Sequence, residues 1–169
     1  MPELPETETI ARDLHAAVVH AVVARVTVHR EDVLREITPV QLTATLRGAR
    51  IARVWRRAKL VVLDIESGLP PTESAPIAIG HIVVQPRFTG ALLLDDGTLP
   101  ADQLNYLTIT FDLEDERALH YRDVRRLGTL SFMSRERFVA YTNKLGPEPL
   151  DDGLTAAVFS GLVRASRRP

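Results

Sequence analysis

Eight short segments with the composition of β-strands follow one another between residues 21 and 132, and they constrain the fold more than any other feature. The first, residues 21–29, alternates apolar and polar side chains through Val22, Val26 and Val28, the pattern of a strand with one buried face. The others span about residues 49–55, 60–65, 77–84, 91–94, 104–112, 118–121 and 129–132. Short strands in this number predict a β-sandwich or flattened barrel.

Helical signals flank and interrupt these strands. Residues 7–19 repeat apolar side chains at a spacing of four, which predicts an amphipathic helix. Residues 38–48 combine a threonine cap, a proline in the first turn and a final glycine. A further helix is expected from Ser134 to about residue 143, whereas the proline-rich residues 68–76 predict a loop. The fold class is therefore α+β: a two-layer, mostly antiparallel β-sandwich of about eight strands with flanking α-helices.

The composition excludes several classes of protein. At 169 residues, with 45% hydrophobic and 25% charged residues, the chain has the size and balance of one soluble globular domain. It contains no cysteine, which excludes a disulfide scaffold, a thiol nucleophile and a cysteine-ligated zinc site within these residues. Its scattered histidines never reach H-x-x-x-H spacing, so we expect no metal site. No apolar run approaches the roughly 20 residues of a membrane span, and the acidic, proline-broken N-terminus is no signal peptide. We therefore expect a cytoplasmic protein.

The cations are almost all arginine and they are clustered. The chain has two lysines, Lys59 and Lys144, against nineteen arginines, which gather in residues 47–57, 122–126 and 164–168. The net charge of −1 argues against indiscriminate binding of polyanions. Two interpretations remain open: arginine is simply the preferred solvated cation of this chain, or the clusters form one basic face.

The N-terminus carries a potential nucleophile. Removal of Met1 would leave Pro2 with a free secondary amine, and an α-amino group has a pKa of roughly 7.7–8.0. Attack of such an amine on a carbonyl-like carbon gives a cationic iminium, which is an electron sink. Glu3 and Glu6 place carboxylates beside it that could transfer protons. Taken alone, these residues favour a polar tail with a helix-capping glutamate over a nucleophile.

Four segments, taken together, resemble one known family. They are M-P-E-L-P-E at residues 1–6, R-R-A-K-L at 56–60, D-V-R-R-L-G at 123–128 and L-G-P-E-P-L at 145–150. In order and spacing they resemble the formamidopyrimidine-DNA glycosylase/endonuclease VIII family, and the P-E-L-P-E opening resembles its formamidopyrimidine branch.

The resemblance implies a bifunctional DNA glycosylase/AP lyase of base excision repair. Such an enzyme removes oxidised purines (8-oxoguanine and formamidopyrimidines) and then cuts the backbone by β,δ-elimination. Pro2 would attack C1′ and form a Schiff base, and Glu3 would be the general acid. Glu6 would position water or hold the N-terminal segment. Lys59, on the family's lysine-bearing strand, would contact phosphate and sugar and assist β-elimination.

The resemblance also implies residues that bind DNA. Chemistry on a stacked base requires its extrusion from the duplex, and wedge side chains fill the vacated space. Phe88 stands at the wedge position where the family usually has methionine, and Leu127 where it has phenylalanine. Arg125 would contact the orphaned cytosine and Arg126 a phosphate. Tyr106 would take the place of a histidine that contacts DNA.

The expected organisation follows from the same resemblance. Residues 1–150 would be the N-terminal catalytic domain, and residues 151–169 the start of a linker and helix that leads to a helix-two-turn-helix and zinc-finger module absent from this chain. Arg167 would contact phosphate in that lead-in. We expect no cofactor in this chain, because the family's structural zinc lies in the finger. The expected partner is damaged double-stranded DNA, bound by a monomer associated with the bacterial nucleoid.

Two other functions remain open. Gln85 and Val124 replace a histidine and a proline that are usual in the family's loops. The altered loops are also compatible with a DNA-damage binding module that has lost catalysis, or with a structural relic that has no role on DNA.

Overall fold

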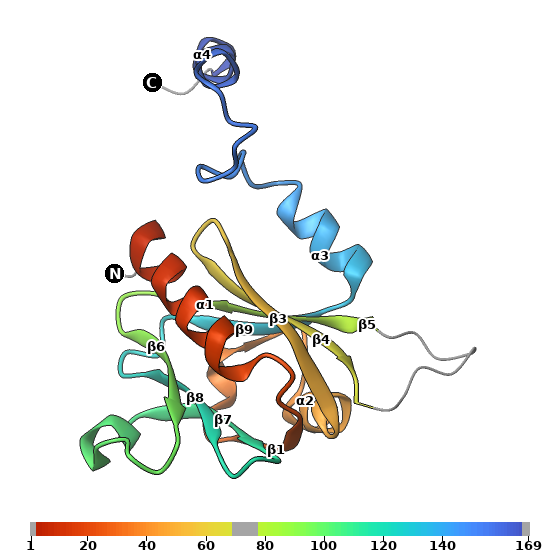
Figure 1. Cartoon of the computed structure of the whole chain (residues 1–169), viewed down its shortest axis with the longest axis vertical. Helices are drawn as coiled ribbons and strands as arrows, with labels where there is room; N and C mark the ends of the chain where they lie inside the picture. Colours follow the sequence, from red (N-terminus) through yellow and green to blue (C-terminus); the bar gives the residue numbers. More distant parts are fainter. Residues whose placement is uncertain (1–2, 69–77, 167–169) are drawn as a thin grey trace.

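The computed structural model describes residues 3–68 and 78–166, in which nine strands form two sheets. The four-stranded sheet has the order β1 (Val23–Val28), β7 (Leu107–Leu113), β8 (Ala118–Asp123) and β6 (Gly90–Asp95). The five-stranded sheet has the order β2 (Leu34–Arg35), β9 (Thr129–Met133), β5 (Ala78–Gln85), β4 (Leu60–Ser67) and β3 (Ala49–Arg57). Neighbouring strands are antiparallel except β2 and β9, which are parallel. The α+β class and the mostly antiparallel sheets are confirmed (Figure 1).

One hydrophobic core fills the space between the sheets. Ile109, Phe111 and Tyr121 enter it from the four-stranded sheet, and Leu63 and Ile82 from the five-stranded sheet. A second cluster forms on the other face of the five-stranded sheet, where α3 (Arg135–Thr142) packs. It contains Leu60, Val62, Val83, Met133 and Phe138. Strand β4 is therefore covered on both faces, which explains its continuous apolar sequence.

The helices begin and end largely where their signals predict. α2 (Pro39–Leu46) has Thr38 as its cap, and Gln41 completes a capping box. α1 (Leu4–Val18) begins three residues before the predicted Thr7. Pro5 does not delay it, because the first turn of a helix leaves its backbone N–H groups unpaired in any case.

Two strand predictions need correction. The strand expected over residues 104–112 begins only at Leu107, because the short 3₁₀ helix η2 (Ala101–Leu104) precedes it and Tyr106 has a φ of +64°. The two-residue strand β2 follows the short 3₁₀ helix η1 (Glu31–Val33) and was not predicted, since two residues show no alternation. The loop expected over residues 68–76 lies almost entirely outside the described residues.

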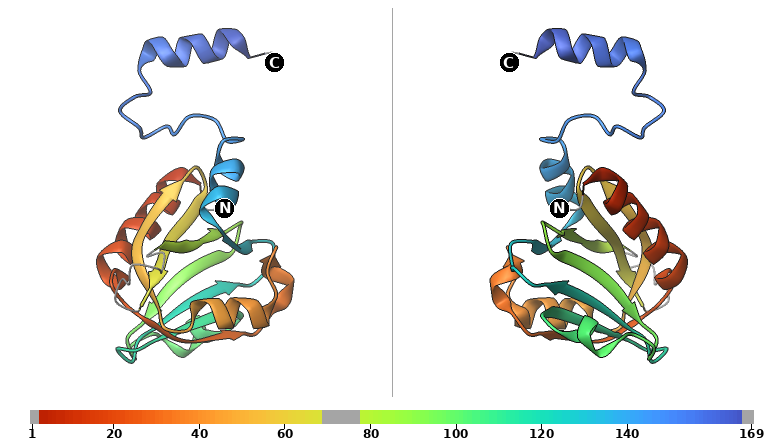
Figure 2. Two further views of the ribbon diagram at one scale, coloured as in Figure 1. Left: turned by 90° about the vertical axis from the view of Figure 1, so that its right-hand side faces the viewer. Right: turned by 90° about the vertical axis from the view of Figure 1, so that its left-hand side faces the viewer.

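The last helix, α4 (Ala156–Ala165), stands away from the sandwich (Figures 1 and 2). Thr155 caps it, and its apolar side chains Val158, Phe159, Leu162 and Val163 are exposed. The sandwich core thus forms without any contribution from this helix. In the described part of the chain, no helix is both long and apolar enough to cross a membrane.

Candidate active site

Two carboxylates and an ammonium meet where α1 begins. Glu3 is the N-cap residue of the helix, and its backbone N–H donates to Glu6 Oε2 at 3.1 Å. The Glu3 carboxylate forms an ion pair with the Nζ of Lys59, and the two side chains are 45% and 47% exposed. Buried Thr7 donates its hydroxyl hydrogen to the Glu3 carbonyl and fixes the first turn. The structure thus brings Glu3, Glu6 and Lys59 together, whereas Pro2 lies outside the described residues.

Lys59 lies between two strands, as the predicted strand bounds have it, and not on a strand as the resemblance implied. Arg57 of β3 pairs directly with Leu60 of β4, so Ala58 and Lys59 form the two-residue turn of a hairpin. Nothing in R-R-A-K-L signals a turn, because such turns favour glycine, asparagine or aspartate. Ala58 nevertheless has a φ of +54°. The turn places Lys59 beside the N-terminus of α1.

Two further loops lie on the same side of the molecule as the N-terminus (Figure 1, and the right-hand view of Figure 2). The β5–β6 loop presents Phe88, which is 50% exposed. The β8–β9 loop presents Arg125, whose Cζ lies 5.2 Å from the centroid of the Phe88 ring, a cation–π contact. Leu127 of the same loop is also exposed. Phe88 and Arg125, from two different loops, are therefore neighbours at this surface.

A buried carboxylate holds these two loops together. Asp123 is 1% exposed, and its Oδ1 accepts from the Thr89 hydroxyl at 2.6 Å and from the Arg125 N–H at 3.2 Å. Its Oδ2 accepts from the Gly128 N–H at 2.8 Å. The functional reading of the sequence missed Asp123 and Thr89. An aspartate directly after a strand, able to bond the backbone two residues later, was the available signal.

Gly128 of the β8–β9 loop lies where there is no room for a side chain. A Cβ atom at this position would lie 2.0 Å from the Tyr121 hydroxyl oxygen and 2.7 Å from the Gln85 carbonyl oxygen. No larger residue fits without moving one loop away from the other. Burial, together with the Asp123 carboxylate, raises the pKa of Tyr121, so this phenol stays neutral. Tyr121 is part of the core.

The remaining predicted DNA contacts border one groove. Tyr106 is exposed, and the Arg122 guanidinium lies 5.9 Å from its ring centroid. Arg126 forms an exposed ion pair with Asp32 at 2.9 Å. Tyr106 and Arg126 line a pocket of about 750 Å³ with Arg30. The lining of this pocket combines arginine, histidine and tyrosine side chains with Asp123, and Arg167 lies outside the described residues. No group of three or more metal-ligating side chains occurs in the described ranges.

Comparison with known proteins decides the family. Residues 1–130 match the family described as Formamidopyrimidine-DNA glycosylase N-terminal domain. The chain belongs to this family. It is 30% identical over 167 residues to the formamidopyrimidine-DNA glycosylase of Brevibacillus brevis. The aligned residues make up 97% of this chain and 55% of that protein. It is 36% identical over 152 residues to the formamidopyrimidine-DNA glycosylase of Stutzerimonas stutzeri, and the aligned residues make up 90% of this chain and 51% of that protein. The chain thus spans about half the length of these relatives of the family.

Solved structures of the family share the fold. A complex between the Lactococcus lactis Fpg and DNA that contains an abasic site has a TM-score of 0.79 at 24% identity, and covers 97% of this chain and 57% of that chain. MutM in complex with DNA that contains carbocyclic 8-oxo-G has a TM-score of 0.69 at 24% identity. This match covers 83% of this chain and 47% of that chain. The β-sandwich is therefore the fold of this family's N-terminal domain.

Proposed function

We propose that this chain is the catalytic part of a DNA glycosylase with AP lyase activity, which removes oxidised purines from double-stranded DNA in base excision repair. The observation that carries the proposal is the pairing of Glu3 with Lys59 at the beginning of α1, directly after Pro2. An acid and a cation are thus paired next in sequence to the proposed amine nucleophile, and excision followed by elimination requires an amine, an acid and a cation.

The proposed reaction uses these groups in sequence. The Pro2 nitrogen attacks C1′ of the damaged nucleotide and the bond from C1′ to the base breaks. The C1′–O4′ bond of the sugar ring then opens, with Glu3 as the general acid that assists both cleavages and protonates O4′. The resulting iminium acidifies C2′, and loss of that proton expels the 3′-phosphate in β-elimination. Expulsion of the 5′-phosphate follows in δ-elimination. Lys59 would hold the phosphate and sugar, and Glu6 would position water or the N-terminal segment. Amine and carboxylate groups suffice, so we propose no cofactor within this chain.

The two loops would open the duplex for this chemistry. Phe88 and Leu127 would fill the vacated stack, Arg125 would contact the unpaired base, and Arg126 with Tyr106 would bind the backbone. We propose residues 1–150 as the catalytic domain and residues 151–169 as the beginning of a linker, which is supported by a core to which α4 contributes nothing.

Single-turnover assays on matched duplexes test the function. With the complete gene product, we expect base release and strand cleavage at 8-oxoguanine or formamidopyrimidine, and none on the undamaged duplex. Lesion-specific binding without base release would instead identify a non-catalytic damage-binding module. Equal binding to damaged and undamaged duplexes would contradict both functions.

A separate prediction concerns Phe88, which stands at the wedge position where the family usually has methionine. Stacking of a base on an aromatic ring is worth about 1–3 kcal/mol by alanine substitution. We therefore expect Phe88→Ala to slow excision from duplex DNA by about 10–100-fold and Leu127→Ala to slow it less. A single-stranded abasic substrate needs no extrusion, so Phe88→Ala should leave its cleavage nearly unchanged. A larger loss for Leu127→Ala, or equal losses on both substrates, would show that Phe88 is no wedge.

A further inference from the structure

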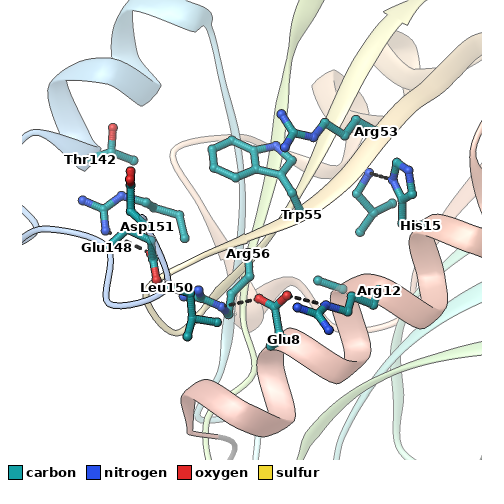
Figure 3. Close-up of a pocket in the computed structure, with 13 residues that line it drawn as sticks. Glu8, Arg12, His15, Arg53, Trp55, Arg56, Thr142, Glu148, Leu150 and Asp151 are labelled. Carbon is teal, nitrogen blue, oxygen red and sulfur yellow. Dashed lines mark hydrogen bonds and ion pairs between the residues drawn. The ribbon is translucent and has the colours of Figure 1, made fainter. Parts of the chain in front are cut away.

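A buried arginine joins three distant segments of the chain behind the active site. The Arg56 side chain on β3 is 3% exposed. Its Nε pairs with Glu8 Oε2 on α1 at 2.7 Å, and its Nη2 pairs with Glu148 Oε1, beyond α3, at 2.5 Å. Figure 3 shows the three side chains converging on one pocket of about 710 Å³. We call Glu8, Arg56 and Glu148 the arginine clamp.

The clamp is charged, and each of its two carboxylates forms an ion pair with Arg56. The hydrogen bond from Arg56 lowers the pKa of Glu8. Burial acts to raise the pKa of Glu148, but the bonds from Arg56 and the Ala58 N–H outweigh burial and lower it. Both carboxylates are therefore ionised at neutral pH and face a guanidinium that has almost no contact with water. Removing one of them would leave buried charge without its partner.

The clamp binds the turn that carries Lys59. Arg56 Nη1 donates to the Ala58 carbonyl at 2.9 Å, and the Ala58 N–H donates to Glu148 Oε2 at 2.9 Å. Both backbone polar groups of Ala58 are thus held by clamp side chains. Ala58 adopts a left-handed conformation that a non-glycine residue seldom keeps without such support.

The conformation of this turn sets the direction in which the Lys59 side chain leaves the backbone. The ion pair between Lys59 and Glu3 is half-exposed to solvent, and exposed pairs of long side chains hold geometry poorly. Glu8 lies on the same helix as Glu3, little more than one turn further on. The clamp therefore fixes both sides of the pair, the helix through Glu8 and the turn through Ala58.

We propose that Glu8, Arg56 and Glu148 are positioning residues that hold Lys59 against Glu3 in the geometry needed for elimination. The consequence for DNA cleavage rests on the proposed function, whereas the consequence for the geometry of Lys59 does not.

The lysine-poor sequence allows a direct measurement of this geometry. The 169-residue chain has only Lys59 and Lys144, so reductive methylation with ¹³C-formaldehyde gives two lysine NMR signals, and Lys144 is the internal reference. Glu3→Gln defines the signal of Lys59 without its partner. We expect Glu148→Gln to move the Lys59 signal most of the way to that position. Glu36→Gln is the matched control, because Glu36 pairs with Arg137 at an exposed site outside the clamp, and it should leave the Lys59 signal in place.

Cleavage of a pre-formed abasic duplex gives the second measurement, with the complete gene product. Small displacements of a reacting group lower rates strongly. We expect Glu148→Gln to lower the single-turnover rate by about tenfold or more while the Kd for the duplex changes less than about twofold. Glu36→Gln should change neither quantity. A purely structural role would lower thermal stability and leave the rate per folded molecule unchanged.

The outcomes separate the two proposals. An unchanged Lys59 signal in folded Glu148→Gln protein overturns the positioning role. If Glu148→Gln does not fold, Glu8→Gln removes the opposite carboxylate of the clamp and is judged by the same signal. If the wild-type gene product does not cleave abasic DNA, the proposed function fails, and the Lys59 signal alone decides the role of the clamp.

Discussion

Retention of Met1 is expected to abolish covalent trapping of the protein on abasic DNA. With Met1 in place, the Pro2 nitrogen belongs to a peptide bond and its lone pair is delocalised into the carbonyl. It can then neither attack C1′ nor form an iminium, so borohydride has nothing to reduce. The measurement compares borohydride-trapped complex on a denaturing gel for the processed protein and for protein made with methionine removal inhibited. Mass spectrometry of the adduct should locate it at Pro2.

Pro2→Gly is expected to give an intermediate amount of trapped complex in the same experiment. A glycine N-terminus keeps an amine that forms an imine, so trapping should be weakened and not lost. The processed protein and the protein that retains Met1 must show the same circular dichroism spectrum, since the comparison of their trapping assumes equal folding. Equal trapping with and without Met1 would assign the nucleophile to another residue.

Glu3→Gln is expected to separate the two chemical steps. Positioned proton transfer contributes typically 10²–10⁴-fold to a rate, so excision of 8-oxoguanine should fall by about 100-fold or more. Cleavage of a pre-formed abasic site should fall much less, because that substrate has no base to expel. Some loss is still expected there, since Glu3 is the ion-pair partner of Lys59. The measurement is the pair of single-turnover rates on duplexes that differ only in the lesion.

The control for this comparison is again Glu36→Gln, which makes the same chemical change at an exposed ion pair outside the site. It should alter neither rate. Equal losses on both substrates for Glu3→Gln would show that Glu3 only shapes the N-terminus of α1 and the Lys59 turn.

Local signals account for the parts of the fold that were predicted. The threonine cap, the proline and the terminal glycine of residues 38–48 act within one short segment, and α2 forms there. The alternation in residues 21–29 predicts one buried face, of which β1 buries Val26, but a register shift between Val23 and Arg25 buries Val23 and leaves Ala24 exposed. Such signals work because the hydrogen bonds and the burial that they describe are decided by neighbours along the chain.

The failures occur where distant residues decide the backbone. Ala58 lies between two predicted strands, and its left-handed turn is held by Glu148, which accepts from its N–H, and by Arg56, which donates to its carbonyl. Tyr106 also has a positive φ, and its carbonyl accepts from the Asp123 N–H of β8. Neither conformation is favoured by the residue itself. Each depends on partners that only the assembled sandwich brings near.

The sequence by itself determined the chemical groups of the candidate site and the class of fold. The carboxylates after Pro2, the single lysine between clustered arginines and the succession of short strands are all visible without a structure. Only the tertiary structure decided that Lys59 meets Glu3, that Asp123 joins the two loops, and that Arg56 is buried between Glu8 and Glu148. For Asp123 and Arg56 the physical reason is that a buried charge is stable only beside its partners. In all three cases the partners come from separate helices, strands or loops.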